Sequence, residues 1–134
     1  LLAGWTLYTS NRELQGEIAL DHLQSLTRLR NLPPEERAAV TPERVNRALL
    51  TAAAARPYSS QPWSAAGDYY FSIGDLDQAD VLYAEALRHS PKRAGLYALR
   101  ARIAFLRQDQ AKAAELLKKA AGLFPHHPGY RVLP

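Results

Sequence analysis

Apolar and small residues recur every three or four positions between residues 60 and 91, in two runs separated by Gly74 and Asp75. The runs consist of Trp63, Ala66, Gly67 and Tyr70, and then of Ala79, Leu82, Tyr83, Ala86 and Leu87. Both follow the spacing of one helical face, so they predict two helices. Gly74 supplies the left-handed residue that closes the first helix, and Asp75 caps the second, with Gln78 completing a capping box. Pro91 prevents the second helix from continuing.

A period of 34 residues underlies this pattern. Proline recurs as Pro57, Pro91 and Pro125, each 34 residues after the one before. Four further registers share the period: Thr41, Asp75 and Asp109; Ala52, Ala86 and Ala120; Leu49, Tyr83 and Leu117; and Leu29, Trp63 and Tyr97. Five registers with one period predict a repeat array in which each unit is a pair of helices.

The small residues have a packing role in this interpretation. Antiparallel helices joined by a tight turn pack at the short end of the range of about 8–10 Å between helix axes. Gly67 on one helix and Ala79 on the other leave room for the neighbouring aromatic rings. Enlarging either residue should overpack the interface, at a cost of about 1–3 kcal/mol.

The pattern resembles the tetratricopeptide repeat (TPR), a family of stacked helical hairpins. The first full unit matches the repeat at Trp63, Gly67, Tyr70, Ala79, Tyr83, Ala86 and Pro91, with Ala66 in place of leucine. The second unit matches at Tyr97, Ala101, Ala113, Leu117, Ala120 and Pro125. It departs from the pattern at Arg100, where leucine is usual, and at Gln108, where glycine is usual. The resemblance implies an all-α fold of hairpins stacked as a short right-handed superhelix, with an extra N-terminal helix.

Residues 41–57 form a degenerate half repeat before the two full ones. Thr41 caps its helix, Pro42 takes the first helical position, and Val45, Leu49 and Ala52 form its buried stripe. We therefore divide the chain into an N-terminal helix and connector (1–40) and a TPR-like array (41–134). The array comprises the half repeat 41–57, repeats 58–91 and 92–125, and a tail at 126–134.

The segment before the half repeat does not follow the repeat pattern, because Leu32-Pro33-Pro34 interrupts it. Residues 11–31 instead predict one long amphipathic helix. Its apolar side is formed by Leu14, Ile18, Leu26 and Leu29. A short turn of helix over Pro34–Ala39 is expected to connect it to the half repeat.

Charge is unevenly distributed, although the chain as a whole carries only +4. The net charge is +1 over residues 1–57, −4 over 58–91 and +7 over 92–134. Such a dipolar arrangement bears on partners and self-association rather than on the fold. One hypothesis is a homo-oligomer in which the acidic repeat of one copy pairs with the basic repeat of another.

Candidate catalytic and metal-binding groups are sparse. His126 and His127 are adjacent between two prolines, so their ring nitrogens point apart and chelate poorly. Ser59 and Ser60 have no neighbouring base to activate them. The acids near residue 75 suit a helix start, and the chain has no cysteine, zinc-type spacing or phosphate-binding glycine loop. We therefore expect no enzyme activity, cofactor or metal, and interpret the chain as a noncatalytic scaffold that binds a protein or peptide.

The TPR resemblance also implies a partner-binding groove lined by the first helix of each unit. Carried across by position, its residues are Gln61, Ser64, Asp68, Phe71 and Ser72, and then Gly95, Ala98, Arg102, Phe105 and Leu106. Asp68 and Arg102 either contact the partner or pair with each other. The clamp with which some relatives hold a C-terminal carboxylate is absent, because Ser64, Asp68, Gly95 and Leu99 occupy its positions.

Two other interpretations stay open for the larger bacterial protein of which we expect this chain to be a part. The uncharged stretch LLAGWTLY ends in residue types that favour a membrane interface. It is consistent with the periplasmic C-terminal tail of a membrane-bound O-antigen polymerase or ligase, tethered by a segment upstream of Leu1. The basic last repeat instead suggests an RNA-associated scaffold, through Arg100, Arg102, Arg107, Lys112, Lys118 and Lys119.

Overall fold

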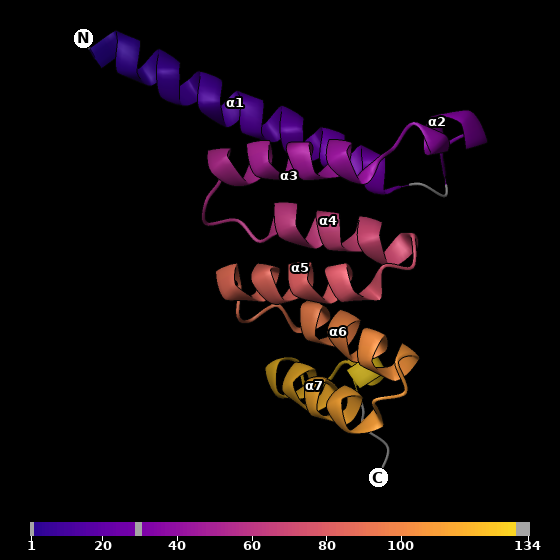
Figure 1. Cartoon of the computed structure of the whole chain (residues 1–134). Helices are drawn as coiled ribbons and strands as arrows, with labels where there is room; N and C mark the ends of the chain where they lie inside the picture. The colour runs from indigo at the N-terminus through magenta and orange to yellow at the C-terminus, as the bar shows by residue number, and fades with distance from the viewer. Residues whose placement is uncertain (1, 29–30, 131–134) are drawn as a thin grey trace.

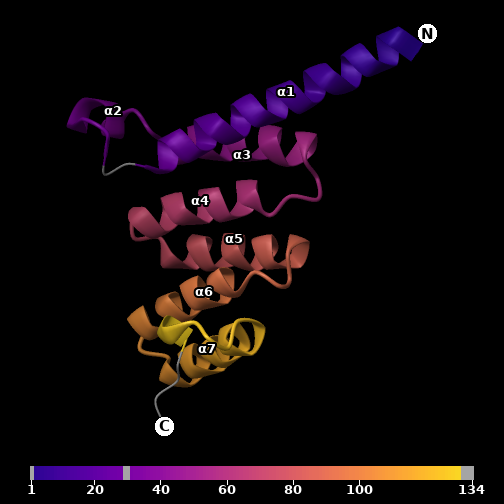
Figure 2. The same cartoon turned by 180° about the vertical axis from the view of Figure 1, so that it is seen from behind.

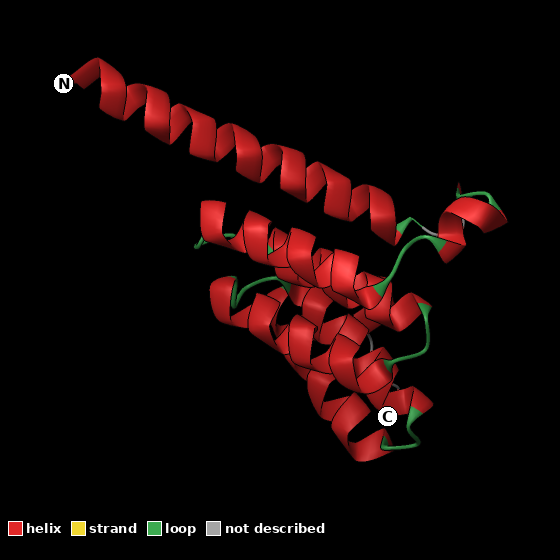
Figure 3. Cartoon of the chain, turned by 45° about the horizontal axis from the view of Figure 1, so that its top comes forward, coloured by secondary structure: helices red, strands yellow, loops and turns green. Residues whose placement is uncertain are grey.

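Stacked helical hairpins make up the computed structural model of the chain (Figure 1). It describes residues 2–28 and 31–130, and their side chains except those of 2–10 and 26–27. The elements are α1 (Leu2–Thr27), α2 (Pro34–Ala38), α3 (Pro42–Ala55), α4 (Gln61–Ser72), α5 (Leu76–His89), α6 (Ala94–Leu106), α7 (Gln110–Leu123) and the 3-10 helix η2 (Pro128–Tyr130). No strand occurs in the described ranges, so the predicted all-α class is confirmed (Figure 3).

The helices form three stacked pairs, α1 with α3, α4 with α5, and α6 with α7. Views from opposite sides show the helices stacked in chain order, from α1 and α3 at one end to α6 and α7 at the other (Figures 1 and 2). Helix α1 packs against both α3 and α4, so it serves as the first helix of the degenerate unit. Its N-terminal half extends beyond the end of α3 (Figure 3).

The buried face of α1 differs from the predicted one. Leu14 and Ile18 are each 53% exposed, whereas Gly16, Leu20 and Leu23 are buried. Two positions along an α-helix amount to a rotation of about 200°, so these two sets of residues lie on nearly opposite faces. Gly16 decides which face is used, because a Cβ at this position would collide with the Cβ of Ala55. The side chain of Leu26, and Leu29 as a whole, lie outside the described parts of the chain.

The core is continuous from α1 to α6. Its largest fully buried side chains include Tyr83, Leu23, Leu96, Ile103 and Val45. A smaller cluster of Ala101, Ala104, Ala113 and Leu116 joins α6 to α7. The alanines and Gly67 at the hairpin interfaces are buried, and a Cβ on Gly67 would lie 2.7 Å from Cε1 of Tyr83. Helix α4 can therefore approach α5 closely only because residue 67 lacks a side chain.

The turn between α4 and α5 contains only half of the predicted capping box. Asp75 Oδ1 accepts a hydrogen bond of 3.1 Å from the amide of Gln78, as expected. The amide of Asp75, however, donates to the carbonyl of Tyr70 at 2.9 Å. The Asp75 amide therefore closes the end of α4 around Gly74, whose φ is +84°. It is not available to the Gln78 side chain. Helix closure and helix capping compete for the same donor here.

Gln108 occupies the equivalent turn between α6 and α7 with a φ of 62°. A side chain in this left-handed region is disfavoured, and glycine is the usual residue there. We expect Gln108→Gly to stabilise the chain by about 0.5–1 kcal/mol. Gly74→Ala should destabilise it by a similar amount, since no atom lies within 4 Å of the added methyl group and only the backbone changes. Urea unfolding of both variants measures the two effects, and a loss of stability in Gln108→Gly would contradict the explanation.

Candidate functional site

The side of the stack formed by α1, α4 and α6 carries two adjoining cavities. The larger, of about 560 Å³, is lined by Arg37, Val40, Asp68, Tyr69, Phe71, Ser72, Ile73, Tyr83, Leu99 and Arg102. The smaller, of about 410 Å³, is lined by Gln24, Arg28, Gln61, Ser64, Ala65, Asp68 and Arg93. Asp68 belongs to both linings. We refer to the residues of these two linings together as the groove.

The groove contains six of the predicted partner-binding residues: Gln61, Ser64, Asp68, Phe71, Ser72 and Arg102. Phe105 and Leu106 lie apart from it, in a separate hollow with Gln108 and Gln110 at the end of α6, where they are 65% and 52% exposed. Ala98 is half-buried on α6. Gly95 faces the tail, since a Cβ on it would lie 3.9 Å from the hydroxyl of Tyr130.

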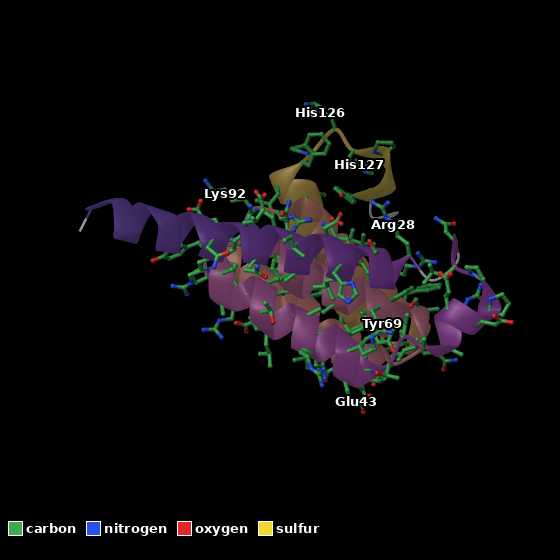
Figure 4. The ribbon with its side chains drawn as sticks, turned by 90° about the horizontal axis from the view of Figure 1, so that it is seen from above. Arg28, Glu43, Tyr69, Lys92, His126 and His127 are labelled. Atoms are coloured by element: carbon green, nitrogen blue, oxygen red, sulfur yellow. The ribbon has the colours of Figure 1, made fainter. Side chains whose placement is uncertain are left out.

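Sequence reasoning missed the contribution of α1, of α2 and its connection to α3, and of the α5–α6 turn. Arg28, Arg37, Val40 and Arg93 reach the groove from these segments. Arg93 lies directly before the first turn of α6, so its place in the sequence could have indicated that it reaches the groove. No periodic signal marks the others, because α1 joins the array out of register with the repeat. In the view from above, Arg28 and Lys92 lie on the side of α1 away from α3, and Glu43 lies on the opposite side (Figure 4).

Asp68 and Tyr83 form a hydrogen-bonded pair at the junction of the two cavities. The hydroxyl of Tyr83 donates to Asp68 Oδ1 at 2.6 Å. Two effects raise the pKa of Tyr83 far above its usual value: burial, which is the larger, and the hydrogen bond to Asp68. Loss of hydration raises the pKa of Asp68, while the bond from Tyr83 and the charge of Arg93 oppose the rise. The pair therefore places the Asp68 carboxyl group, held by a buried hydroxyl, at the junction of the two cavities.

The raised pKa of Asp68 makes its ionisation unfavourable for folding. The folded chain retains this proton to higher pH than the unfolded chain, whose value is near 3.8. The penalty is absent below that value, grows as pH rises through the folded pKa, and persists above it. We expect Asp68→Asn, which can still accept the hydrogen bond from Tyr83, to gain stability relative to the wild type between pH 3 and pH 7. Urea unfolding at both pH values measures this gain, and a difference between the two chains that does not change with pH would contradict it.

Arg102 does not pair with Asp68. Its guanidinium lies over the ring of Phe71, with the central carbon 5.2 Å from the ring centroid. Asp68 accepts its hydrogen bond from Tyr83 instead. The structure therefore does not show the predicted alternative in which Asp68 and Arg102 pair with each other. The contact of Arg102 with Phe71 is a cation over an aromatic face, a weak interaction that a partner can replace.

Three of the five acids in the acidic repeat form ion pairs with arginines of the chain. Asp80 receives a bidentate contact from Arg100, with Nε to Oδ1 at 2.8 Å, and Asp77 pairs with Arg107. Glu85 pairs with Arg88 at 3.1 Å. These bonds engage part of the charge on which the hypothesis of a homo-oligomer depends, and that hypothesis stays a prediction. They also engage two of the six basic residues considered for RNA binding.

The histidines have structural neighbours. Trp63 and His89 are stacked, with ring centroids 5.8 Å apart. His127 stacks on Tyr130 at 4.0 Å, and its Nδ1 accepts a hydrogen bond from the amide of Gly129 at 3.1 Å. Figure 4 shows His126 and His127 on the tail, on the same side of the molecule as Arg28. Over the residues described, no three His, Asp or Glu side chains gather as they would around a metal ion.

The membrane hypothesis depends on LLAGWTLY, whose side chains lie outside those described. A search of the described helices finds none with the length and apolar character needed to cross a bilayer. Tethering through a segment upstream of Leu1 stays a prediction.

Solved structures with the same fold come from helical repeat proteins. The first TPR of Spaghetti (RPAP3), bound to an HSP90 peptide, has a TM-score of 0.67 at 12% identity, over 88% of this chain and 86% of that one. The Yersinia enterocolitica type III secretion translocator chaperone SycD has a TM-score of 0.62 at 19% identity, over 83% and 80%. MamA has a TM-score of 0.58 at 16% identity, over 79% of this chain and 58% of the MamA chain.

No protein-family model matches the sequence, and no curated protein matches it. The structural similarity nevertheless places the chain in the class of TPR-like helical repeat folds, which confirms the fold predicted from the period of 34 residues. At these identities the similarity concerns the fold alone.

Proposed function

We propose that the chain is a noncatalytic module that holds a peptide segment of a protein partner in the groove. The observation that carries the proposal is the continuity of two cavities across α1, α4 and α6, joined at Asp68. The lining combines an aromatic ring, aliphatic side chains and separate polar groups. Such a mixture provides both apolar burial and orienting contacts for a bound segment.

The structural neighbours support this proposal. The RPAP3 domain holds a peptide of HSP90, SRMEEVD, and SycD is a chaperone. In repeat proteins of this kind, stacking produces an extended surface, and the inner helices supply the contacts. The module would therefore act by binding and positioning a partner rather than by transforming it.

Selection of peptides from a random 12-residue phage library on the immobilised chain tests the proposal. We expect enriched peptides to bind the purified chain, and Phe71→Ala to weaken that binding about five- to thirtyfold, as for a central aromatic contact. Leu50→Ala is the matched control, because Leu50 is 66% exposed on α3 and belongs to neither cavity lining. Circular dichroism should show both variants folded. Peptides that bind equally well to Phe71→Ala would exclude the groove as the binding site.

A further inference from the structure

Four arginines line the groove, and they come from four different segments. Arg28 follows α1, Arg37 lies on α2, Arg93 precedes α6, and Arg102 lies on α6. Within the described residues, none of the four forms an ion pair. Arg93 donates to the hydroxyl of Ser60 at 2.8 Å, Arg37 to the carbonyl of Leu32 at 3.2 Å, and Arg102 lies over Phe71.

Four arginines outside the groove are used differently. Arg56, Arg88, Arg100 and Arg107 each contact a carboxylate of the same chain. These four arginines are neutralised by acids of the chain, whereas the four groove arginines have no carboxylate partner among the described residues and stay available to a bound segment. With Asp68 as the one acid in the two linings, the groove carries a net positive charge. A partner of opposite charge is favoured in the encounter and in the complex.

The acid at the junction divides these cations into two pairs. Arg37 and Arg102 line the larger cavity, and Arg28 and Arg93 line the smaller one. The larger cavity also presents Val40, Phe71, Ile73 and Leu99. A partner carboxylate beside Asp68 would be repelled, whereas a carboxylate beside either arginine pair would be attracted.

We propose that the groove selects an acidic peptide segment with two groups of carboxylates separated by an uncharged centre that carries an apolar side chain. The carboxylates bind the two arginine pairs, and the apolar side chain enters the larger cavity beside Phe71. This inference rests on the proposed function and names the chemistry of its partner. The clamp positions hold Ser64, Asp68, Gly95 and Leu99, none of which is a cation. The carboxylates are therefore bound by the groove arginines, and a C-terminal carboxylate is not required.

The enriched library peptides provide the probe. We expect Asp and Glu to be enriched at two separated positions, with aromatic or aliphatic residues and few acids between them. Arg37→Gln combined with Arg102→Gln should weaken the binding of one such synthetic peptide about three- to tenfold, as expected for two exposed ion pairs. Raising the salt concentration should weaken wild-type binding and reduce this difference. Asp68→Asn should admit acids at the centre of newly selected peptides.

The control variant combines Arg88→Gln with Lys118→Gln, which removes the same charge from α5 and α7 and should change affinity by less than about twofold. Peptides that require Phe71 but show no enrichment in acids, and bind equally to the Arg37→Gln, Arg102→Gln chain, would overturn this inference and leave the proposed function standing. If no selected peptide requires Phe71, the proposed function itself fails. A fluorescein-labelled 20-nucleotide oligo(U) that binds more tightly than any peptide, and depends on the same arginines, would overturn the inference in favour of RNA.

Discussion

Replacing Gly67 with alanine is expected to destabilise the chain, although alanine is the better helix former. The added Cβ would lie 2.7 and 2.8 Å from two carbons of the Tyr83 ring. That ring is 1% exposed and is fixed by its hydrogen bond to Asp68, so it cannot move aside freely. Overpacking costs about 1–3 kcal/mol, against a gain in helix propensity of up to about 1 kcal/mol. We expect a net loss of about 1–2 kcal/mol in the free energy of unfolding, measured by urea titration.

Two further variants test whether the Tyr83 ring causes this loss of stability: a control at Gly122, and a Tyr83 variant that removes the ring. Gly122→Ala on α7 adds a methyl group with no atom within 4 Å, and should be neutral or stabilise by about 0.5 kcal/mol. In the next repeat, Ala101 and Leu117 stand where Gly67 and Tyr83 stand here. In a Tyr83→Leu background, Gly67→Ala should therefore no longer destabilise. An unchanged penalty in that background would show that the Tyr83 ring does not cause it.

Replacing Arg100 with leucine, the usual residue of the repeat at this position, should destabilise the chain by about 2–3 kcal/mol. Arg100 and Asp80 face each other with side-chain exposures of 20% and 16%, and two nitrogens contact two oxygens. Without the guanidinium, the Asp80 carboxylate is left largely buried and unpaired. Urea unfolding at neutral pH measures the loss.

Two further variants separate a buried charge from a lost contact. Combining Arg100→Leu with Asp80→Ala removes both ions, and should return stability to within about 1 kcal/mol of the wild type. Arg107→Leu breaks the pair with Asp77, whose side chain is 92% exposed, and should cost less than about 0.5 kcal/mol. Equal losses in Arg100→Leu and Arg107→Leu would refute the role assigned to burial.

The repeat geometry was accessible from the sequence because its determinants are local or periodic. Caps such as Thr41, Asp75 and Asp109 act on amides three residues away. Residues at a spacing of 34 must repeat their environment when identical hairpins stack. For this reason a single period was sufficient to predict α3 to α7.

The N-terminal helix is present as predicted, but the prediction of its buried face was wrong for a physical reason. Leu14 and Ile18 have the spacing of a buried face, but so do Gly16, Leu20 and Leu23 on the other side. Hydrophobicity alone favoured the leucine and isoleucine pair. Close packing against Ala55 favoured the face that contains Gly16. An ion pair between Arg56 and Glu17, at 2.6 Å, also holds α1 against the end of α3. Only the packed neighbour could decide between the two faces.

The sequence by itself determined the helical class, the hairpin unit, the positions of the turns and the need for small residues between helices. These properties depend on backbone preferences and on spacing within one repeat. The tertiary structure alone decided that α1 completes the first hairpin and that Arg28, Arg37 and Arg93 join the groove. It also decided that Asp77 and Asp80 of the middle repeat pair with arginines of the next one. Charges and cavities depend on which residues meet across helices, and no local pattern encodes those distances.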